Sequence, residues 1–285
     1  MPIGVIDIGS NTTRLLVARI DNGEIVPLEK GRVRLALGEE IERTGGVSET
    51  SIAAAAKAAR KLCAIARRCG VEELDVFLTA PGRQSANADE LVAALRRATK
   101  HSVRVLTTEE EGRLAYAGAV ATADVPLRGA VAVCDVGGAS TEIAIGSGSG
   151  APDWVESVDL GSVRLTARAG SLAEAVAEAR LALDGLEPQP VDTALCVGGT
   201  ARATRRLVGP LLGDAELKEA LGLVETTPPR ALARRFGVDR ARAEILPAGV
   251  AILAQVHELL GVPLHVCGGG IREGAVLASL AERAA

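Results

Sequence analysis

Short apolar runs and helical apolar stripes alternate along the chain. Residues 3–8 form a short, mostly apolar run that ends at Gly9, which predicts a buried strand. Residues 15–20 predict a second strand, and Asn22-Gly23 directly after it is typical of a hairpin turn. Residues 33–37 predict a third strand. The chain therefore opens with a small group of strands.

Helical spacing first appears between residues 48 and 69, where apolar residues recur on one face and Gly70 follows as a stop signal. A strand at residues 74–79, a helix at 88–98, a strand at 103–106 and a helix at 109–120 follow in turn. Such alternation of strands with helices is typical of layered α/β proteins. The pattern predicts an α/β fold.

The pattern then restarts. Residues 5–13 (VIDIGSNTT) align with residues 133–141 (VCDVGGAST) at an offset of 128 residues, and a further strand follows each copy. An internal repeat of this kind indicates that one structural unit occurs twice in the fold. It predicts two similar lobes, residues 1–124 and residues 125–285, with the final helix free to pack back on the first lobe.

Composition restricts the partners. The chain has 285 residues, a net charge of −4 and only four aromatic side chains (one Trp, one Tyr, two Phe). It lacks both an overall basic field for nucleic acid or a membrane surface and the rings of a base-stacking platform. We expect neither partner, and any anion site must be local. No secretory signal and no apolar stretch of about 20 residues is visible, which predicts a cytoplasmic protein.

Glycine, serine and threonine follow several predicted strands. Glycine lets the backbone approach an anion and point successive N–H groups at it, and hydroxyl groups add donors. A phosphate chain, which offers only acceptor oxygens, suits such loops; the alternative is that each is merely a tight turn. The candidate phosphate-binding residues are Gly9, Ser10, Asn11 and Thr12 in the first loop and Gly137, Gly138, Ala139, Ser140 and Thr141 in the second.

Three carboxylates, Asp7, Asp135 and Glu142, stand beside these loops. They would repel a phosphate unless a cation intervened, and Mg²⁺ typically takes one or two carboxylates, several waters and phosphate oxygens. They are therefore candidate ligands of Mg²⁺ or a similar hard ion such as Mn²⁺. The alternative is that Asp7 and Asp135 only bond the amides of their own turns.

A glutamate-rich segment begins the helix predicted at residues 109–120. Thr108 and Glu111 fit a capping box, and three successive acids complement the helix dipole. The functional alternative is that one glutamate faces a cleft and acts as a general base on water. Arg83, which follows Pro81-Gly82 after a strand, is a candidate for clamping phosphate.

Several stretches, taken together and in this order, resemble the exopolyphosphatase and guanosine pentaphosphate phosphohydrolase (Ppx/GppA) family of the actin-like superfamily. They are residues 6–12 (IDIGSNT), 79–87 (TAPGRQSAN), 109–118 (EEEGRLAYAG), 135–142 (DVGGASTE) and 160–164 (LGSVR). Weaker matches are residues 197–200 and 267–270. The resemblance implies two actin-like, ribonuclease H-like lobes with the active site in the cleft between them.

The resemblance also implies residue roles. Glu111 would be the catalytic base, Asp135 and Glu142 would hold the metal or orient water, the two loops would bind phosphates, and Arg83 would contact the chain. The implied activity is metal-dependent hydrolysis of the terminal phosphoanhydride of inorganic polyphosphate. Alternatives are a guanosine pentaphosphate (pppGpp) 5′-phosphohydrolase, a sugar or acid kinase, and an actin-like nucleotide-binding protein without hydrolase activity. A homodimer is compatible with this reading.

Two departures from the family pattern qualify the resemblance. Ala139 stands where the family usually has a third glycine, so a methyl group narrows the second loop. Longer members carry a C-terminal helical extension, for which a chain ending at Ala285 has no room. We therefore expect short polyphosphates to be favoured over long ones.

Overall fold

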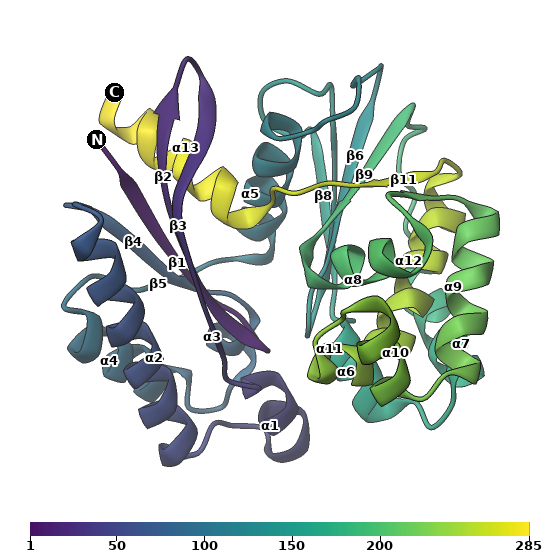
Figure 1. Cartoon of the computed structure of the whole chain (residues 1–285), viewed down its shortest axis with the longest axis horizontal. Helices are drawn as coiled ribbons and strands as arrows, with labels where there is room; N and C mark the ends of the chain where they lie inside the picture. Colours follow the sequence, from purple (N-terminus) through teal and green to yellow (C-terminus); the bar gives the residue numbers. More distant parts are fainter. Residues whose placement is uncertain (285) are drawn as a thin grey trace.

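Two β-sheets organise the chain, and the computed structural model describes residues 1–284 (Figure 1). The first sheet has the strand order β3-β2-β1-β4-β5. Its strands are β1 (Ile3–Ile8), β2 (Thr12–Asp21), β3 (Glu24–Arg34), β4 (Leu74–Leu78) and β5 (Arg104–Val105). Strands β1, β2 and β3 are antiparallel neighbours, whereas β4 and β5 run parallel to β1.

The second sheet repeats this topology. Its order is β10-β11-β9-β6-β7-β8. The strands are β6 (Val131–Val136), β7 (Thr141–Gly146), β8 (Trp154–Val158), β9 (Thr193–Val197), β10 (Leu211–Leu212) and β11 (Leu264–Val266). Strands β6, β7 and β8 form the antiparallel meander, and β9 and β11 add in parallel to β6. The α/β fold with two related halves is therefore confirmed.

Thirteen helices in the described part of the chain surround the sheets. Five precede β6: α1 (Leu37–Thr44), α2 (Glu49–Arg68), α3 (Ala80–Gln84), α4 (Ala88–Thr99) and α5 (Thr108–Ala121). Eight follow β8: α6 (Ser162–Arg168), α7 (Leu172–Leu183), α8 (Gly198–Val208), α9 (Asp214–Thr226), α10 (Pro229–Phe236), α11 (Arg240–Glu244), α12 (Leu246–Leu260) and α13 (Ile271–Ala284). None of the described helices combines the length and the apolar composition that crossing a membrane would need.

Each sheet is buried on both faces. Apolar residues of β1 and β2 pack on one side against Leu62 of α2 and Leu91 of α4, and on the other side against Val276 of α13. In the second sheet, α7 and α12 cover one face, and Tyr116 of α5 covers the other. Two helices each cover the sheet of the other half. Helix α5, which follows the first sheet in the chain, packs on the second sheet, and α13, the last helix, packs on the first (Figure 1).

Helices α5 and α13 meet backbone to backbone. A Cβ built on Gly118 would lie 1.9 Å from the carbonyl oxygen of Gly270, and one built on Gly274 would lie 2.0 Å from that of Leu114. No larger side chain fits without moving a main chain. The two crossing helices therefore depend on glycine where they join the two halves.

The strand predicted at residues 33–37 is wrong in its bounds. Strand β3 starts immediately after the Asn22-Gly23 turn, in which both residues have positive φ (51° and 84°), and it ends at Arg34. Most of β3 is exposed, and its one apolar run, residues 25–28, is short and contains a proline, which is unusual inside a strand. Leu37, assigned to that strand, instead begins α1 and is fully buried. The pattern also gave no sign of α6 or α9.

Candidate active site

The two repeated loops close equivalent hairpins. In the first, Asp7 pairs with Arg14 across β1 and β2, and the Gly9 N–H donates to the Thr12 carbonyl at 3.2 Å. In the second, Asp135 pairs with Glu142 across β6 and β7, and the Gly137 N–H donates to the Ser140 carbonyl at 3.0 Å. Asp7 and Asp135 thus occupy equivalent positions in the two hairpins, whereas the residue paired with them is Arg14 in the first hairpin and Glu142 in the second.

The two loops lie against each other, and each is held from behind. A Cβ built on Gly138 would be 3.2 Å from Ser10 Cβ. The Gly38 N–H donates to the Ser10 carbonyl at 2.7 Å, and the Val163 N–H of α6 donates to the Gly138 carbonyl at 2.8 Å. Backbone N–H groups of α1 and α6 therefore donate to carbonyl groups of the loops, and the N–H groups of the loops stay free to face the space between them.

Five loop amides have no protein acceptor. Among the described residues, none of the backbone N–H groups of Ser10, Asn11, Gly138, Ala139 and Ser140 donates a hydrogen bond to another protein group. Ser10, Asn11, Ala139 and Ser140 are nevertheless buried. Buried amides are almost always paired, so this set calls for an external acceptor. Clustered amides without partners are the usual composition of an anion site.

A cavity of about 110 Å³ lies between the loops and collects most of the predicted site residues. Twelve of the fourteen line it: Asp7, Gly9, Ser10, Asn11, Thr12, Glu111, Asp135, Gly137, Gly138, Ala139, Ser140 and Glu142. Thr141 and Arg83 do not. The Thr141 hydroxyl is fully buried and donates to the Leu160 carbonyl at 2.6 Å, so its contact is structural.

The N-terminus of α5 is capped one residue earlier than predicted. The capping box joins Thr107 and Glu110: the Thr107 hydroxyl accepts from the Glu110 N–H at 3.1 Å, and the Glu110 carboxylate accepts from the Thr107 N–H at 2.7 Å. The predicted pairing of Thr108 with Glu111 is therefore wrong. Because capping does not use Glu111, its carboxylate is free to face the cavity.

Arg83 lies behind Glu111 rather than in the cavity. Its Nη1 is 2.5 Å from Glu111 Oε2 and also donates to the Leu106 carbonyl at 2.7 Å. The geometry between Nη1 and Oε2 is that of an ion pair rather than a hydrogen bond, and the buried Arg83 Nη2 has no hydrogen-bond partner among the described residues. Arg83 thus orients the glutamate and keeps one donor unused.

Burial raises the pKa of all four carboxyl groups around the cavity. It raises the pKa of Glu142 to about 7, assisted by the charge of Asp135 and opposed by hydrogen bonds from Ser140 and Ser157. Burial raises the pKa of Asp7 to about 6, against the attraction of Arg14. The pKa of Glu111 is raised well above its usual value by burial and by Glu142, while Arg83 opposes the shift. Burial also raises the pKa of Asp135.

These mutually repelling acids suit a divalent cation that needs few protein ligands. No group of three or more His, Cys, Asp or Glu side chains in the described chain is arranged to hold a metal ion. Mg²⁺ keeps most of its waters and adds one or two carboxylates and phosphate oxygens, which fits the cavity.

Two arginines at this site were not predicted: Arg14 and Arg242 line the cavity. Gly198 and Gly199 at the start of α8 also line it; they belong to the weakly matching segment 197–200 but were not among the candidate phosphate-binding residues. Gly198 has φ +90°, and a Cβ on it would lie 2.3 Å from Asp135 Oδ1. For Arg14 the repeat held a signal, because its partner position at the offset of 128 is Glu142. For Arg242 the local sequence held none.

Known proteins are similar to this chain over most of its length. The profile of the Ppx/GppA phosphatase family matches residues 16–212. A guanosine-5′-triphosphate,3′-diphosphate pyrophosphatase of Pseudoalteromonas atlantica is 31% identical over 96% of this chain, which spans 58% of that relative's length. Exopolyphosphatase 1 of Mycobacterium tuberculosis is 27% identical over the whole chain and 90% of its own length.

A solved structure shows the same architecture. The crystal structure of the Aquifex aeolicus Ppx/GppA family member superposes with a TM-score of 0.84 at 26% identity, covering 99% of this chain and 98% of the other. Both sheets and the cleft between them are therefore arranged as in a solved protein of this type.

Proposed function

Because the chain belongs to the Ppx/GppA phosphatase family, we propose that it hydrolyses the terminal phosphoanhydride of inorganic polyphosphate and releases phosphate. The observation that carries the proposal is the cavity in which buried loop amides without partners meet Glu111. Phosphoryl transfer requires little covalent chemistry from the protein, and positioning and charge stabilisation dominate its catalysis.

The two loops bind the terminal phosphoryl group in this proposal. Amides of Ser10 and Asn11 approach from one side and those of Gly138, Ala139 and Ser140 from the other, with the hydroxyl of Thr12, which has no hydrogen-bond partner in the described protein, beside them. Fixed donors of this kind stabilise charge that develops on the transferring oxygens.

Glu111 is the general base. Its carboxylate lines the cavity, Arg83 fixes its orientation, and burial together with the charge of Glu142 raises its pKa, which makes it a stronger base than an exposed glutamate. Glu111 would orient a water molecule and accept its proton as the oxygen attacks phosphorus. Glu142 of β7 lines the same cavity, and burial raises its pKa as well.

A divalent cation, Mg²⁺ or Mn²⁺, completes the proposal. Asp135 and Glu142, which face each other across β6 and β7, would hold it together with water and phosphate oxygens, and Asp7 would lie on the same cavity without completing a three-carboxylate cage. When bound, such an ion supplies charge neutralisation for the phosphate oxygens. Without it, the buried acids would oppose the approach of a phosphate chain.

A pppGpp 5′-phosphohydrolase is the alternative, because the relative from P. atlantica carries that name. It would use the same carboxylates and loops and would need a site for guanine. The cavity between the loops has no aromatic lining residue on which a base could stack. Polyphosphate is therefore the first choice. The cytoplasmic location, the homodimer, the preference for short chains and the lobe boundary between residues 124 and 125 stay predictions.

Phosphate release from tripolyphosphate, long-chain polyphosphate, pppGpp and ATP, each with Mg²⁺ or Mn²⁺, tests the proposal. We expect release from the polyphosphates that requires the cation and stops with EDTA. Release from pppGpp alone would replace the proposed substrate with the nucleotide. Consumption of ATP only when a sugar or acid acceptor is present would indicate a kinase, and release from none would contradict hydrolase activity.

A further inference from the structure

Ser157 of β8 donates a hydrogen bond to the carboxylate of Glu142. Its hydroxyl oxygen lies 3.1 Å from Glu142 Oε1. Glu142 pairs with Asp135 of β6 on one side and with Ser157 on the other, so the three residues form one row across the antiparallel strands β6, β7 and β8. Residues directly opposite each other in neighbouring strands project from the same face of the sheet. The row therefore places a hydroxyl group beside the two carboxylates of the proposed metal site.

This row lies on the face of the sheet that α5, the helix of Glu111, covers. Val155, two residues before Ser157 on β8, projects from the same face and packs against the apolar cluster that includes α5. A Cβ built on Gly112 of α5 would lie 2.4 Å from Val155 Cγ1 and 3.8 Å from Glu142 Cβ. Ser157 is partly buried here but does not line the cavity between the loops. It therefore acts on a ligand in that cavity through Glu142 rather than by direct contact.

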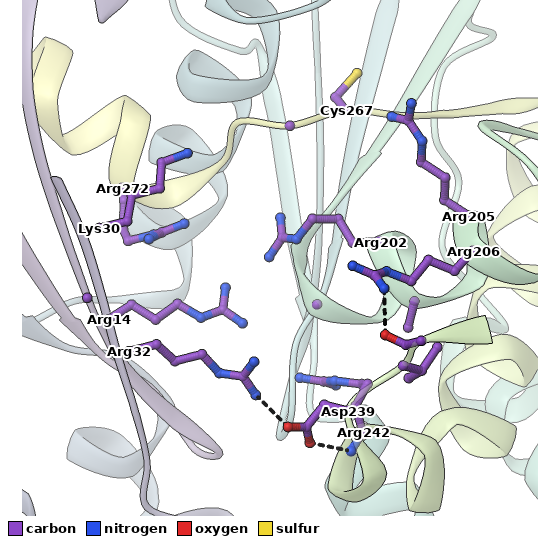
Figure 2. A pocket seen from close by; sticks show the side chains of 16 residues that line it. Arg14, Lys30, Arg32, Arg202, Arg205, Arg206, Asp239, Arg242, Cys267 and Arg272 are labelled. Carbon is purple, nitrogen blue, oxygen red and sulfur yellow. Dashed lines mark hydrogen bonds and ion pairs between the residues drawn. The ribbon is translucent and has the colours of Figure 1, made fainter. Parts of the chain in front are cut away.

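The equivalent row in the first half has no carboxylate in its middle. There Asp7 pairs with Arg14 of β2, and Arg14 pairs with Arg32 of β3. Figure 2 shows Arg14 and Arg32 extending from these strands into an adjoining cavity of about 780 Å³, which several further arginines line. The two halves thus share the aspartate and differ in the two residues beside it. Of these two rows, only that of the second half sets a hydroxyl donor beside a carboxylate.

The hydrogen bond from Ser157 holds Glu142 independently of the phosphate loops. Hydrogen bonds to an ionised acceptor are roughly twice as strong as those between neutral groups. The hydroxyl of Ser140, in the second loop, also hydrogen-bonds this carboxyl group. Ser140 lines the cavity, however, so a phosphate bound between the loops competes for its hydroxyl. Ser157 lies outside the cavity and is not exposed to that competition.

Divalent cations differ in how strictly they need a fixed carboxylate. Mg²⁺ requires nearly ideal octahedral geometry, whereas Ca²⁺ accepts more oxygen ligands in flexible arrangements and binds carboxylates through one or both oxygens. The number and the flexibility of the ligands therefore decide which ion a site prefers. A carboxylate held by a neighbouring strand suits the smaller and more demanding ion.

We propose that Ser157 is a positioning residue, which fixes the Glu142 carboxylate for the divalent cation and thereby favours Mg²⁺ and Mn²⁺ over Ca²⁺. The inference rests on the metal site of the proposed function. Hydrogen-bond partners of metal ligands orient those ligands, and losing one typically costs roughly 10- to 100-fold in metal affinity or activity. Ser157 takes no part in the chemistry itself.

Electron paramagnetic resonance of Mn²⁺, whose sharp aqueous signal is lost on binding, tests this role without turnover. Mn²⁺ is titrated into the full chain with inorganic phosphate present, and Mg²⁺ and Ca²⁺ are then added as competitors. Ser157→Ala removes the hydroxyl, and Ser157→Thr keeps it. The matched control is Ser147→Ala, in the loop between β7 and β8, where the exposed hydroxyl donates to the Ser149 carbonyl at 3.1 Å. Thermal unfolding checks that each variant is folded.

Ser157→Ala should weaken Mn²⁺ binding by roughly 10-fold and Ca²⁺ binding by less, so that Ca²⁺ competes better than in the wild type. Ser157→Thr and Ser147→Ala should bind Mn²⁺ as the wild type does. In assays of phosphate release, Ser157→Ala should need more Mg²⁺ for its half-maximal rate while KM for polyphosphate at saturating Mg²⁺ stays the same. Unchanged Mn²⁺ affinity in Ser157→Ala, or equal losses for Mn²⁺ and Ca²⁺, would overturn the inference.

This inference and the proposed function fail separately. Phosphate release by a wild type whose Mn²⁺ affinity does not depend on the Ser157 hydroxyl would refute only the positioning role. Mn²⁺ binding that depends on this hydroxyl, in a chain that hydrolyses no polyphosphate, would refute only the proposed function. A wild type that binds no Mn²⁺ would overturn the metal site and the role of Ser157 together. If threonine lowers the unfolding midpoint, the contrast between Ser157→Ala and Ser147→Ala decides.

Discussion

Glu111 combines burial with a single fixed partner. Only 9% of its side chain is exposed, and Arg83 holds one of its oxygens. A carboxylate in such surroundings binds a proton more readily than one in water, because burial disfavours its charge. Arg83 opposes this effect, because its positive charge favours the ionised form. The pair therefore suits a residue that must both lose and accept a proton.

Replacing Glu111 with glutamine tests this role. The amide keeps the size of the side chain but cannot accept the proton of water, so kcat for phosphate release should fall by roughly 10²- to 10⁴-fold. The matched control is Glu109→Gln, two residues earlier on α5, where the side chain is 64% exposed and pairs with Arg113. It should leave kcat nearly unchanged. Similar rates for both variants would remove Glu111 from the chemistry.

The buried acids also predict how stability depends on pH. Burial raises the pKa of Glu142 from 4.5 to about 7 and that of Asp7 from 3.8 to about 6. Between these limits the folded protein binds more protons than the unfolded chain, so these groups make it less stable as pH rises. Without divalent metal, the midpoint temperature of thermal unfolding should therefore decrease as the pH is raised from 5 to 7.5.

Two comparisons isolate this effect. Glu142→Gln should flatten the decline, because an amide does not titrate. Adding Mg²⁺ with phosphate should raise the midpoint more at pH 7.5 than at pH 5, because bound ligand stabilises only the folded state and meets ionised acids there. A midpoint that rises with pH in the wild type, with the same slope in Glu142→Gln, would contradict the assignment.

Helices α5 and α13 depend on close backbone contact. Gly118→Ala would place a methyl group 1.9 Å from the Gly270 carbonyl oxygen, which cannot move without shifting α13. Such overpacking typically costs about 1–3 kcal/mol of unfolding free energy, and rigid backbone on both sides favours the upper end. Chemical denaturation would measure the loss.

Gly222→Ala is the matched control for this substitution. Gly222 also lies inside a helix, α9, but a Cβ there meets nothing within 4 Å. Alanine should stabilise that helix by roughly 0.5–1 kcal/mol, because glycine loses more backbone freedom on folding. Equal effects of the two substitutions would show that helix propensity, and not the contact between α5 and α13, determines the result.

Local signals explain which elements the sequence predicted. The repeated hairpins were recognisable because an Asp, a glycine turn and flanking strands recur within nine residues. The cap of α5 was placed one residue late because Thr107 and Thr108 each precede a glutamate by three residues, so both fit a capping box. Only the tertiary structure selects Thr107. Strand β3 was misplaced because its exposed residues carry no apolar period.

Longer-range assembly explains what remained hidden. Arg14, Lys30, Arg202 and Arg242 are far apart in the chain and meet only when both halves are in place. Each of them alone is indistinguishable from an ordinary surface cation. The two repeated loops were predictable because each is one contiguous segment, whereas the cavity lined by these cations depends on how the two sheets are oriented.

An ion-paired contact joins the two halves near the loops. Glu42 of α1 accepts a hydrogen bond from Arg164 of α6, and both side chains are mostly buried, with 13% and 6% exposed. Arg168 lies 3.5 Å from the same carboxylate, and Gln84 donates to Asp159 at 2.8 Å nearby. The first turn of α6 also supports the second loop through the Gly138 carbonyl. This contact therefore connects α1, in the first half of the chain, to the helix that supports the second loop.

Glu42→Ala should weaken both stability and substrate binding. Removing one partner of a buried ion pair leaves an uncompensated charge and typically costs about 3–5 kcal/mol, and Asp159, 3.1 Å from Arg164 but largely exposed, compensates only in part. A less firmly held α6 should raise KM for polyphosphate more than it lowers kcat. The control, Asp21→Ala, breaks an exposed pair with Arg19 and should cost at most about 1 kcal/mol without changing KM. Denaturant unfolding and steady-state kinetics measure the two effects. A stability loss with KM unchanged would separate the interlobe contact from the positioning of the second loop.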